Sequence, residues 1–192
     1  PSPYEFKVIF GPIVHSIEKK LFEHESFIKT VPVEDRANAI FEDIFREGAS
    51  YVETDFTSFE AHFTKDKMKI WHDFIMYMLG FDFDTSGQTA TKVTNQHRQQ
   101  HMSYEQVTNM SLSQATLFCL ETINGQRHLK MRNFGSFQMI ARRCSGEMDT
   151  SSGNGYTNKI MMDFSAFKME TQLDCKVEGD DGLGRYAKNI NP

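Results

Sequence analysis

Residues 173–186 read Leu-Asp-Cys-Lys-Val-Glu-Gly-Asp-Asp-Gly-Leu-Gly-Arg-Tyr. The turn-forming residues Gly179-Asp180-Asp181 between two short runs predict a β-hairpin with strands over 173–178 and 182–186. Asp-rich turns are common, and this tripeptide occurs by chance in roughly a few per cent of chains of this length. Two adjacent carboxylates nevertheless repel each other, and a divalent cation such as Mg²⁺, which prefers oxygen ligands, would offset that repulsion.

A second acidic motif follows a short run that is typical of a strand. Residues 50–55 read Ser-Tyr-Val-Glu-Thr-Asp, and Asp55 and Glu60 form the pattern D-x-x-x-x-E. Taken alone this pattern is weak, because about 90% of such carboxylates are expected in solvated loops. If the strand pairs with the hairpin, Asp55 and Asp180 meet at one edge of a sheet. Two Mg²⁺ ions about 3.5–4 Å apart could then be held there, as in polymerases and nucleases.

The third motif lies between these two. Residues 145–154 read Ser-Gly-Glu-Met-Asp-Thr-Ser-Ser-Gly-Asn and contain S-G-x-x-x-T-x-x-x-N, a match with a chance probability of about a few parts per thousand. A Ser/Gly turn leading into an N-capped helix explains the first residues without any function. It does not explain Gly153 and Asn154 inside a helix predicted over 150–170, where both cost stability relative to alanine.

Apolar spacing and turn residues predict the remaining elements. The helix over 66–79 is capped by Thr64, ends at Gly80 and has Met68, Trp71 and Ile75 as core residues. The polar stretch 84–111 fits no period and predicts an extended excursion or loop. The other predicted elements are helices over about 12–29, 37–45 and 111 or 113 to 123, and a hairpin with strands over 129–132 and 137–142.

Composition narrows the class of protein. The chain has 192 residues, of which 39% are hydrophobic and 24% charged, with a net charge of −5. These values fit one globular domain, and they imply that any nucleic-acid binding is local rather than driven by overall charge. The three cysteines lack zinc-ligand spacing and favour a reducing compartment. Both ends look cut from a longer chain, so we expect a fragment.

In their order along the chain, first the pattern at 55–60, then that at 145–154 and last that at 179–181, the three motifs resemble the palm core of viral RNA-dependent RNA polymerases. There, motif A is D-x-x-x-x-D, motif B is S-G-x-x-x-T-x-x-x-N and motif C is G-D-D. Residues 143–154 and the run 10–18, Phe-Gly-Pro-Ile-Val-His-Ser-Ile-Glu, look most like the tombusvirus-like branch of positive-strand RNA viruses. Glu60 departs from the usual Asp, and Glu178 stands where this branch often has Asn.

The resemblance implies an α+β fold, namely a right-hand polymerase palm in which helices back an antiparallel sheet, with inserted finger segments and no thumb. Residues 1–192 would be a partial polymerase domain. Within it we expect finger and palm helices over 1–49, palm motif A over 50–80, a fingers-like insertion over 81–126, and palm motifs B and C over 127–192.

The resemblance also implies an activity, which is RNA-directed RNA polymerisation by two-metal nucleotidyl transfer. Two Mg²⁺ ions, with Mn²⁺ as an alternative, would be ligated by Asp55, Asp180 and the backbone carbonyl of Phe56, with Asp181 as an auxiliary carboxylate. Gly146 would let its loop flex. The set that reads the ribose 2′-hydroxyl would be Glu60, Ser145, Thr150 and Asn154.

The implied partners are an RNA template and product strand, ribonucleoside triphosphates, and the rest of a replicase chain with its fingers motif and thumb. The setting would be a viral replication complex in the host cell cytoplasm, with no membrane span in this segment. A reverse transcriptase would have Tyr-x-Asp-Asp at the hairpin, which this chain lacks. The alternative is a catalytically silent RNA-binding module of a replicase, and the isolated fragment is expected to be inactive.

Overall fold

The computed structural model describes residues 4–81, 109–124, 126–131, 133, 135–140, 143–144 and 146–188. Two 3-10 helices, η1 (Val33–Asp35) and η2 (Phe59–His62), accompany the main elements. Those elements, in chain order, are α1 (Tyr4–Leu21), α2 (Arg36–Ile44), β1 (Ser50–Thr54), α3 (Lys65–Met78), α6 (Leu112–Asn124), β2 (Gln126–Met131), β3 (Gly135–Ile140), α7 (Thr150–Lys168), β4 (Leu173–Glu178) and β5 (Asp181–Tyr186).

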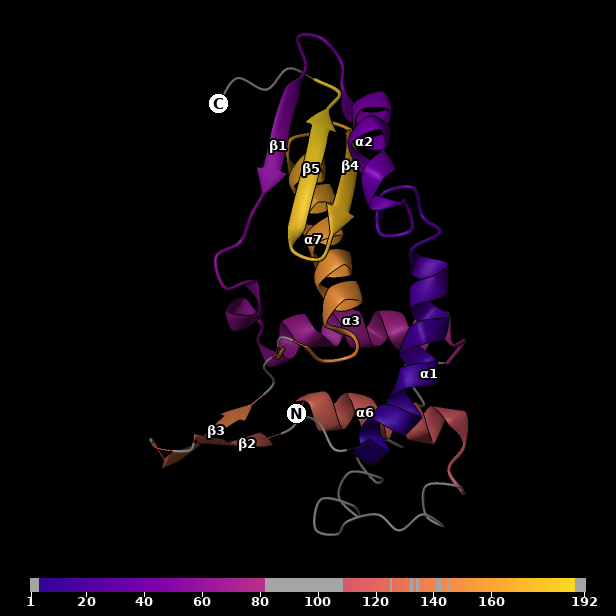
Figure 1. Cartoon of the computed structure of the whole chain (residues 1–192), viewed down its shortest axis with the longest axis vertical. Coiled ribbons are helices and arrows are strands. Elements are labelled where there is room, and N and C mark those ends of the chain that lie inside the picture. Colours follow the sequence, from indigo (N-terminus) through magenta and orange to yellow (C-terminus); the bar gives the residue numbers. More distant parts are fainter. Residues whose placement is uncertain are drawn as a thin grey trace. The chain divides into compact units, whose positions relative to one another are not determined.

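The architecture is α+β, with a three-stranded antiparallel sheet in the order β1-β5-β4 and a separate β2-β3 hairpin (Figure 1). The chain divides into two compact units, each built from two stretches. The first unit contains residues 1–17 and 60–148, and the second contains residues 18–59 and 149–192. None of the helices in the described ranges has the length and apolar character needed to cross a lipid bilayer.

In the first unit, α3 has the predicted core face. Met68, Trp71 and Ile75 are each 0% exposed, as expected for residues spaced three and four apart along a helix. Thr64 caps the helix, because its side chain accepts a hydrogen bond from the backbone N–H of Lys67 at 3.5 Å. The helix predicted over 66–79 is therefore confirmed together with its cap.

A buried histidine links α3 to α6 in the same unit. His72 is 5% exposed, and its Nδ1 lies 2.9 Å from Nδ2 of Asn124. Desolvation lowers the pKa of His72 to about 3, and the positive charges of Arg143 and Lys69 act in the same direction. The ring is therefore neutral at physiological pH and serves as part of the packing between the two helices.

Helix α1 differs from its prediction over 12–29. It begins at Tyr4, contains Pro12 and ends at Leu21, because its buried stripe extends upstream of the proline to Phe6 and Phe10. Residues 22–29 are not helical, so that part of the prediction was wrong. The segment pairs with β4 instead, and the N–H of Val177 donates to the carbonyl of Ser26 at 2.7 Å.

The second unit is the three-stranded sheet with α7 on one face and α2 next to β4 (Figure 1). The face toward α7 carries alternate residues of each strand, among them Cys175, Val177, Gly182 and Gly184, which are all buried. Helix α2 is confirmed, but within it only Ile44 is buried. Its predicted apolar stripe is therefore largely exposed, with Phe41 at 59%.

The other predicted elements are also confirmed, with ends displaced by a few residues. These are the helices at 111 or 113 to 123 and 150–170, the strand at 50–55, and the hairpins at 129–142 and 173–186. The predicted excursion over 84–111 lies outside the described residues apart from its last three positions.

Candidate functional site

The end of β1 lies beside the hairpin formed by β4 and β5. In the antiparallel register Thr54, the last residue of β1, pairs with Gly182. Asp55 follows Thr54 directly, so its backbone leaves the sheet next to the turn that carries Asp180. This is the strand pairing on which the predicted meeting of the motif A and motif C carboxylates depends.

The hairpin turn is shorter than predicted. Glu178 pairs with Asp181 across the strands, so the turn consists of Gly179 and Asp180, and Asp181 is already the first residue of β5. Gly179 has a φ of +63°, and a type II′ turn has glycine at this position. Two-residue turns of this kind match the right-handed twist of paired strands, which explains why pairing continues up to Asp181.

Five carboxylates belong to this end of the sheet, which we call the acidic end: Glu53, Asp55, Glu178, Asp180 and Asp181. Desolvation raises the pKa of Asp181 above its ordinary value, and the negative charges of Asp180 and Asp55 raise it further, followed by those of Glu178 and Glu53. The carboxylates repel one another, so a positively charged ligand would be bound favourably here. Within the described ranges, however, no three His, Cys, Asp or Glu side chains are grouped so that they could hold a metal ion by themselves.

Glu178, which departs from the family pattern, has a structural partner. Nη1 of Arg36 donates to Oε2 of Glu178 at 2.5 Å, and Nε of Arg36 donates to the carbonyl of Val31 at 3.0 Å. The Arg36 side chain is 23% exposed. Arg36, at the start of α2, therefore offsets the additional negative charge next to the turn. Nothing local in the sequence indicates this pair, because the two residues are 142 positions apart.

A buried side-chain amide is hydrogen-bonded to the backbone and to a side chain at the acidic end. Asn158 of α7 is 0% exposed, and its Nδ2 donates to the backbone carbonyl of Asp180 at 2.8 Å and to Oγ1 of Thr54 at 3.0 Å. The Thr54 hydroxyl can donate in return to Oδ1 of Asn158 at 3.2 Å. Sequence reasoning missed both residues. The available signal was an asparagine four positions after Asn154, in a helix whose first two turns contain two glycines and no aliphatic residue.

Glycines allow α7 and β5 to approach each other closely. A Cβ at Gly182 would lie 2.5 Å from Oγ1 of Thr54 and 3.0 Å from Nδ2 of Asn158. A Cβ at Gly155 of α7 would lie 3.4 Å from the backbone N of Gly179. The distances at Gly182 are too short for a side chain, so the neighbouring residues would have to shift to accept one, whereas the 3.4 Å distance at Gly155 is an ordinary contact that leaves no spare room.

The predicted motif B residues fall in different parts of the chain. Thr150 begins α7 and is half-buried, whereas Asn154, one turn later, is 2% exposed. Both belong to the unit that contains the acidic end. Gly146, with a φ of +80°, and Glu60, which is half-buried in η2, belong to the first unit. Ser145 lies outside the described residues.

Phe56, the predicted backbone ligand, begins the loop that follows β1. Its side chain is half-buried, and its ring lies 4.6 Å from the ring of Phe59, measured between centroids. Ser58, between the two, has a φ of +55°, an unfavourable region for a residue other than glycine. The paired rings hold a tight loop directly after Asp55.

Comparisons with models of protein families, with curated proteins and with solved structures found no match to this chain.

Proposed function

We propose that the chain is the palm, with part of the fingers, of a viral RNA-directed RNA polymerase. The observation that carries the proposal is the register of the sheet. It puts Asp55 of the motif A pattern beside the turn residue Asp180 and beside Asp181, the first residue of β5, which belong to the motif C pattern, although the two patterns are far apart in the sequence. Helix α7, which contains Thr150 and Asn154 of motif B, backs the same sheet.

The donor set at the acidic end fits divalent cations. Mg²⁺ is commonly bound through one or two carboxylates together with substrate phosphates, rather than by a complete set of protein ligands. A site of this kind needs no group of three protein ligands. The mutual repulsion that raises the pKa of Asp181 is relieved when a cation is bound. Asp55, Asp180 and the carbonyl of Phe56 would hold two Mg²⁺ ions, or Mn²⁺, with Asp181 as an auxiliary ligand.

The proposed reaction joins a ribonucleotide to the 3′ end of an RNA strand under the direction of an RNA template. The 3′-hydroxyl attacks the α-phosphorus of a ribonucleoside triphosphate, a new phosphodiester bond forms, and pyrophosphate leaves. Phosphoryl transfer depends mainly on positioning and charge neutralisation, so this chain needs no protein nucleophile. The carboxylates of the acidic end would hold the ions, which would supply the charge neutralisation.

Residues of motif B and Glu60 would recognise the ribose. Thr150 is half-buried and can present its hydroxyl to a ligand, whereas Asn154 is 2% exposed, a position typical of a residue that orients other groups. Glu60, Ser145 and Gly146 complete the proposed set. Glu60 differs from the family Asp by one methylene, so Glu60→Asp is expected to retain activity. An inactive variant would show that the geometry is tuned to Glu.

The setting proposed for this activity is a viral replication complex in the host cytoplasm, where the remaining fingers and the thumb of a replicase would grip the RNA template, product strand and nucleotides. The alternative, a catalytically silent RNA-binding module, is an outcome of the experiment described next.

The test is Mg²⁺-dependent ribonucleotide incorporation on an RNA template by the full-length protein. Asp180→Asn and Asp55→Asn are expected to reduce incorporation by more than about 100-fold, because each removes charge that positions the reacting groups. Asp174→Asn, at the opposite end of the same sheet, is the matched control and should retain activity. A folded, RNA-binding wild type without any incorporation would identify the silent module, and equal activity of all three variants would exclude the proposed site.

A further inference from the structure

The positions of the carboxylates at the acidic end depend on the backbone of β1 and of the hairpin turn. One side chain, Asn158, is hydrogen-bonded to both segments. The Asn158 amide donates to the carbonyl of Asp180 and to the hydroxyl of Thr54. Thr54 immediately precedes Asp55. The Asp180 carbonyl belongs to the peptide that links Asp180 to Asp181. Asn158 is therefore hydrogen-bonded to groups adjacent to all three of the proposed carboxylate ligands.

We propose that Asn158 is the positioning residue of this site, and that its amide sets the separation and direction of Asp55 and the Asp180-Asp181 pair. This inference rests on the proposed function, because it assigns the residue that prepares the same carboxylates for cations. Nothing in the motif resemblance assigns a role to Asn158.

The planarity of the peptide bond explains how one hydrogen bond can position two side chains. The carbonyl of Asp180 and the N–H of Asp181 lie in one rigid plane. Holding the carbonyl at 2.8 Å from the Asn158 amide therefore restricts the backbone torsions on both sides of that plane. The same restriction limits the directions in which the two aspartate side chains leave the turn.

The second hydrogen bond ties β1 to the same amide. Asparagine has two N–H donors and one carbonyl acceptor, and here all three groups have partners at 2.8, 3.0 and 3.2 Å. The Thr54 hydroxyl can donate to Oδ1 of Asn158, or to the backbone carbonyls of Gly182 at 3.4 Å and Asp180 at 3.5 Å, so it lies within hydrogen-bonding distance of both the amide and the hairpin. The Asn158 amide thus links the end of β1 to the turn and helps to set the distance between them.

The burial of Asn158 and the charges near it explain why its hydrogen bonds can hold β1 and the turn together. Asn158 is 0% exposed, so water cannot replace the amide once it is removed. The carboxylates above it repel one another, and in the absence of a cation this repulsion acts to separate β1 from the turn. A neutral donor opposes the separation without adding charge, which neither an ionised aspartate nor an apolar residue could do.

The experiment measures Mn²⁺ affinity by electron paramagnetic resonance on the chain, together with the Mg²⁺ concentration that gives half-maximal incorporation in the full-length protein. Asn158→Leu and Thr54→Val remove the hydrogen bonds, whereas Thr54→Ser retains the hydroxyl and should rescue. Ala166→Gly, two turns further along α7 at a residue 4% exposed, is the control for general destabilisation. Thermal unfolding of each variant shows that it is folded under the binding conditions.

We expect Asn158→Leu and Thr54→Val to weaken Mn²⁺ binding by about 10–100-fold and to raise the half-maximal Mg²⁺ concentration in parallel, with the nucleotide KM unchanged. Thr54→Ser and Ala166→Gly should stay within about twofold of wild type. Equal Mn²⁺ affinity in Asn158→Leu, Thr54→Val and Ala166→Gly, or a wild type that binds no Mn²⁺, would overturn the inference. Failure of the proposed function alone gives a different result. Wild type would still bind Mn²⁺ and Asn158→Leu and Thr54→Val would still bind it more weakly, but no protein would incorporate ribonucleotides on an RNA template.

Discussion

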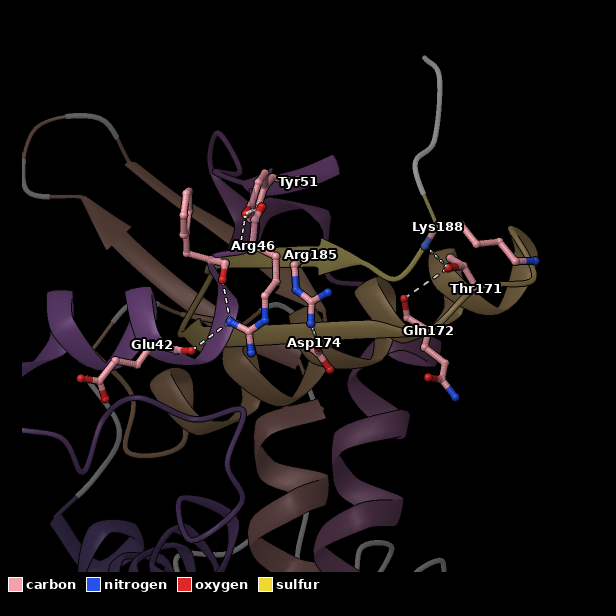
Figure 2. Close-up of polar contacts among 9 residues, drawn as sticks. Glu42, Arg46, Tyr51, Thr171, Gln172, Asp174, Arg185 and Lys188 are labelled. Carbon is pink, nitrogen blue, oxygen red and sulfur yellow. Dashed lines mark hydrogen bonds and ion pairs between the residues drawn. The ribbon is translucent and has the colours of Figure 1, made fainter. Parts of the chain in front are cut away.

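Acidic side chains have opposite electrostatic environments at the two ends of the three-stranded sheet. At the end formed by the first residues of β1 and β4, Asp174 is paired with Arg185 of the adjacent strand. Tyr51 of β1 is the register partner of Arg185 on the other side of β5, and its hydroxyl accepts a hydrogen bond from the backbone N–H of Arg46 at 2.8 Å (Figure 2). At the acidic end, by contrast, the charges that act on Asp181 are all negative.

The difference supports the proposal that the acidic end is a functional site. The charges of the first end are compensated within the fold, as expected where side chains serve stability. Among the described residues, the acidic end has one compensating ion pair, Arg36 with Glu178, and the repulsion that Asp180 and Asp55 exert on Asp181 remains. Native proteins commonly keep such unfavourable local arrangements at functional sites. Five measurements compare the two ends, in order of decreasing expected effect.

The largest effect is expected from close packing at the acidic end. Gly182→Ala would place a Cβ 2.5 Å from Oγ1 of Thr54, a short side chain that cannot move away, and should lower the free energy of unfolding by about 1–3 kcal/mol. Gly184→Ala, nearer the paired end, would meet the flexible tips of Leu173 and Met162 at 2.8 and 2.9 Å and Cγ1 of Val52 at 3.1 Å, and should cost less because its closest neighbours can move. Chemical denaturation of both variants measures the difference, and equal costs would show that the Thr54 contact is not critical.

The next largest effect is expected from the ion pair between Arg36 and Glu178. Arg36→Gln removes the hydrogen bond and ion pair to Glu178 and should destabilise the chain by about 1 kcal/mol, because the pair is charge-assisted but half-exposed. The double variant with Glu178→Asn should recover most of that loss, since no unpaired charge remains. A double-mutant cycle in urea measures the coupling between the two residues, and additive effects would contradict the pairing.

A smaller effect of opposite sign is expected at Asp181. Asp181→Asn should raise the free energy of unfolding at neutral pH without divalent cations by about 0.2–1 kcal/mol, because like charges across a strand pair are destabilising. Urea denaturation in the presence of EDTA measures this, and millimolar Mg²⁺ should stabilise wild type more than the variant.

The same residue predicts a pH dependence. Its folded-state pKa lies above the ordinary value of 3.8, so folding favours the protonated form. The penalty is therefore absent below pH 3.8, appears as the pH rises through 3.8 toward the raised pKa, and is complete above it. The stability advantage of Asp181→Asn over wild type should follow this course, and a constant advantage across the range would argue against a raised pKa.

The smallest effect is expected at the paired end. Asp174→Asn weakens the contact with Arg185 and should lower the free energy of unfolding by a few tenths of a kcal/mol, roughly the contribution of an exposed ion pair. The sign is thus opposite to that of Asp181→Asn. If both substitutions change stability in the same direction under identical buffer conditions, the two ends do not differ in the way described here.

Local patterns in the sequence were sufficient for most elements. Thr64 and the spacing of Met68, Trp71 and Ile75 predicted α3 and its cap, and Gly179 predicted the hairpin, because capping, helical periodicity and turn preference act over a few residues. The prediction was wrong over residues 22–29, where pairing with β4 replaced the helix. That pairing joins Ser26 to Val177, which no local pattern indicates.

In the candidate site, too, some features could be predicted from the sequence and others depend on the fold. The order and residue types of the three patterns that resemble motifs A, B and C, and thus the choice of Asp55, Asp180 and Asp181 as candidate ligands, are contained in the sequence itself. The contacts that position these residues, Asn158 with Thr54 and Arg36 with Glu178, span 104 and 142 positions of the chain. They exist only once the strands are in register and the helices are packed, because a hydrogen bond between distant residues depends on the three-dimensional path of the whole chain.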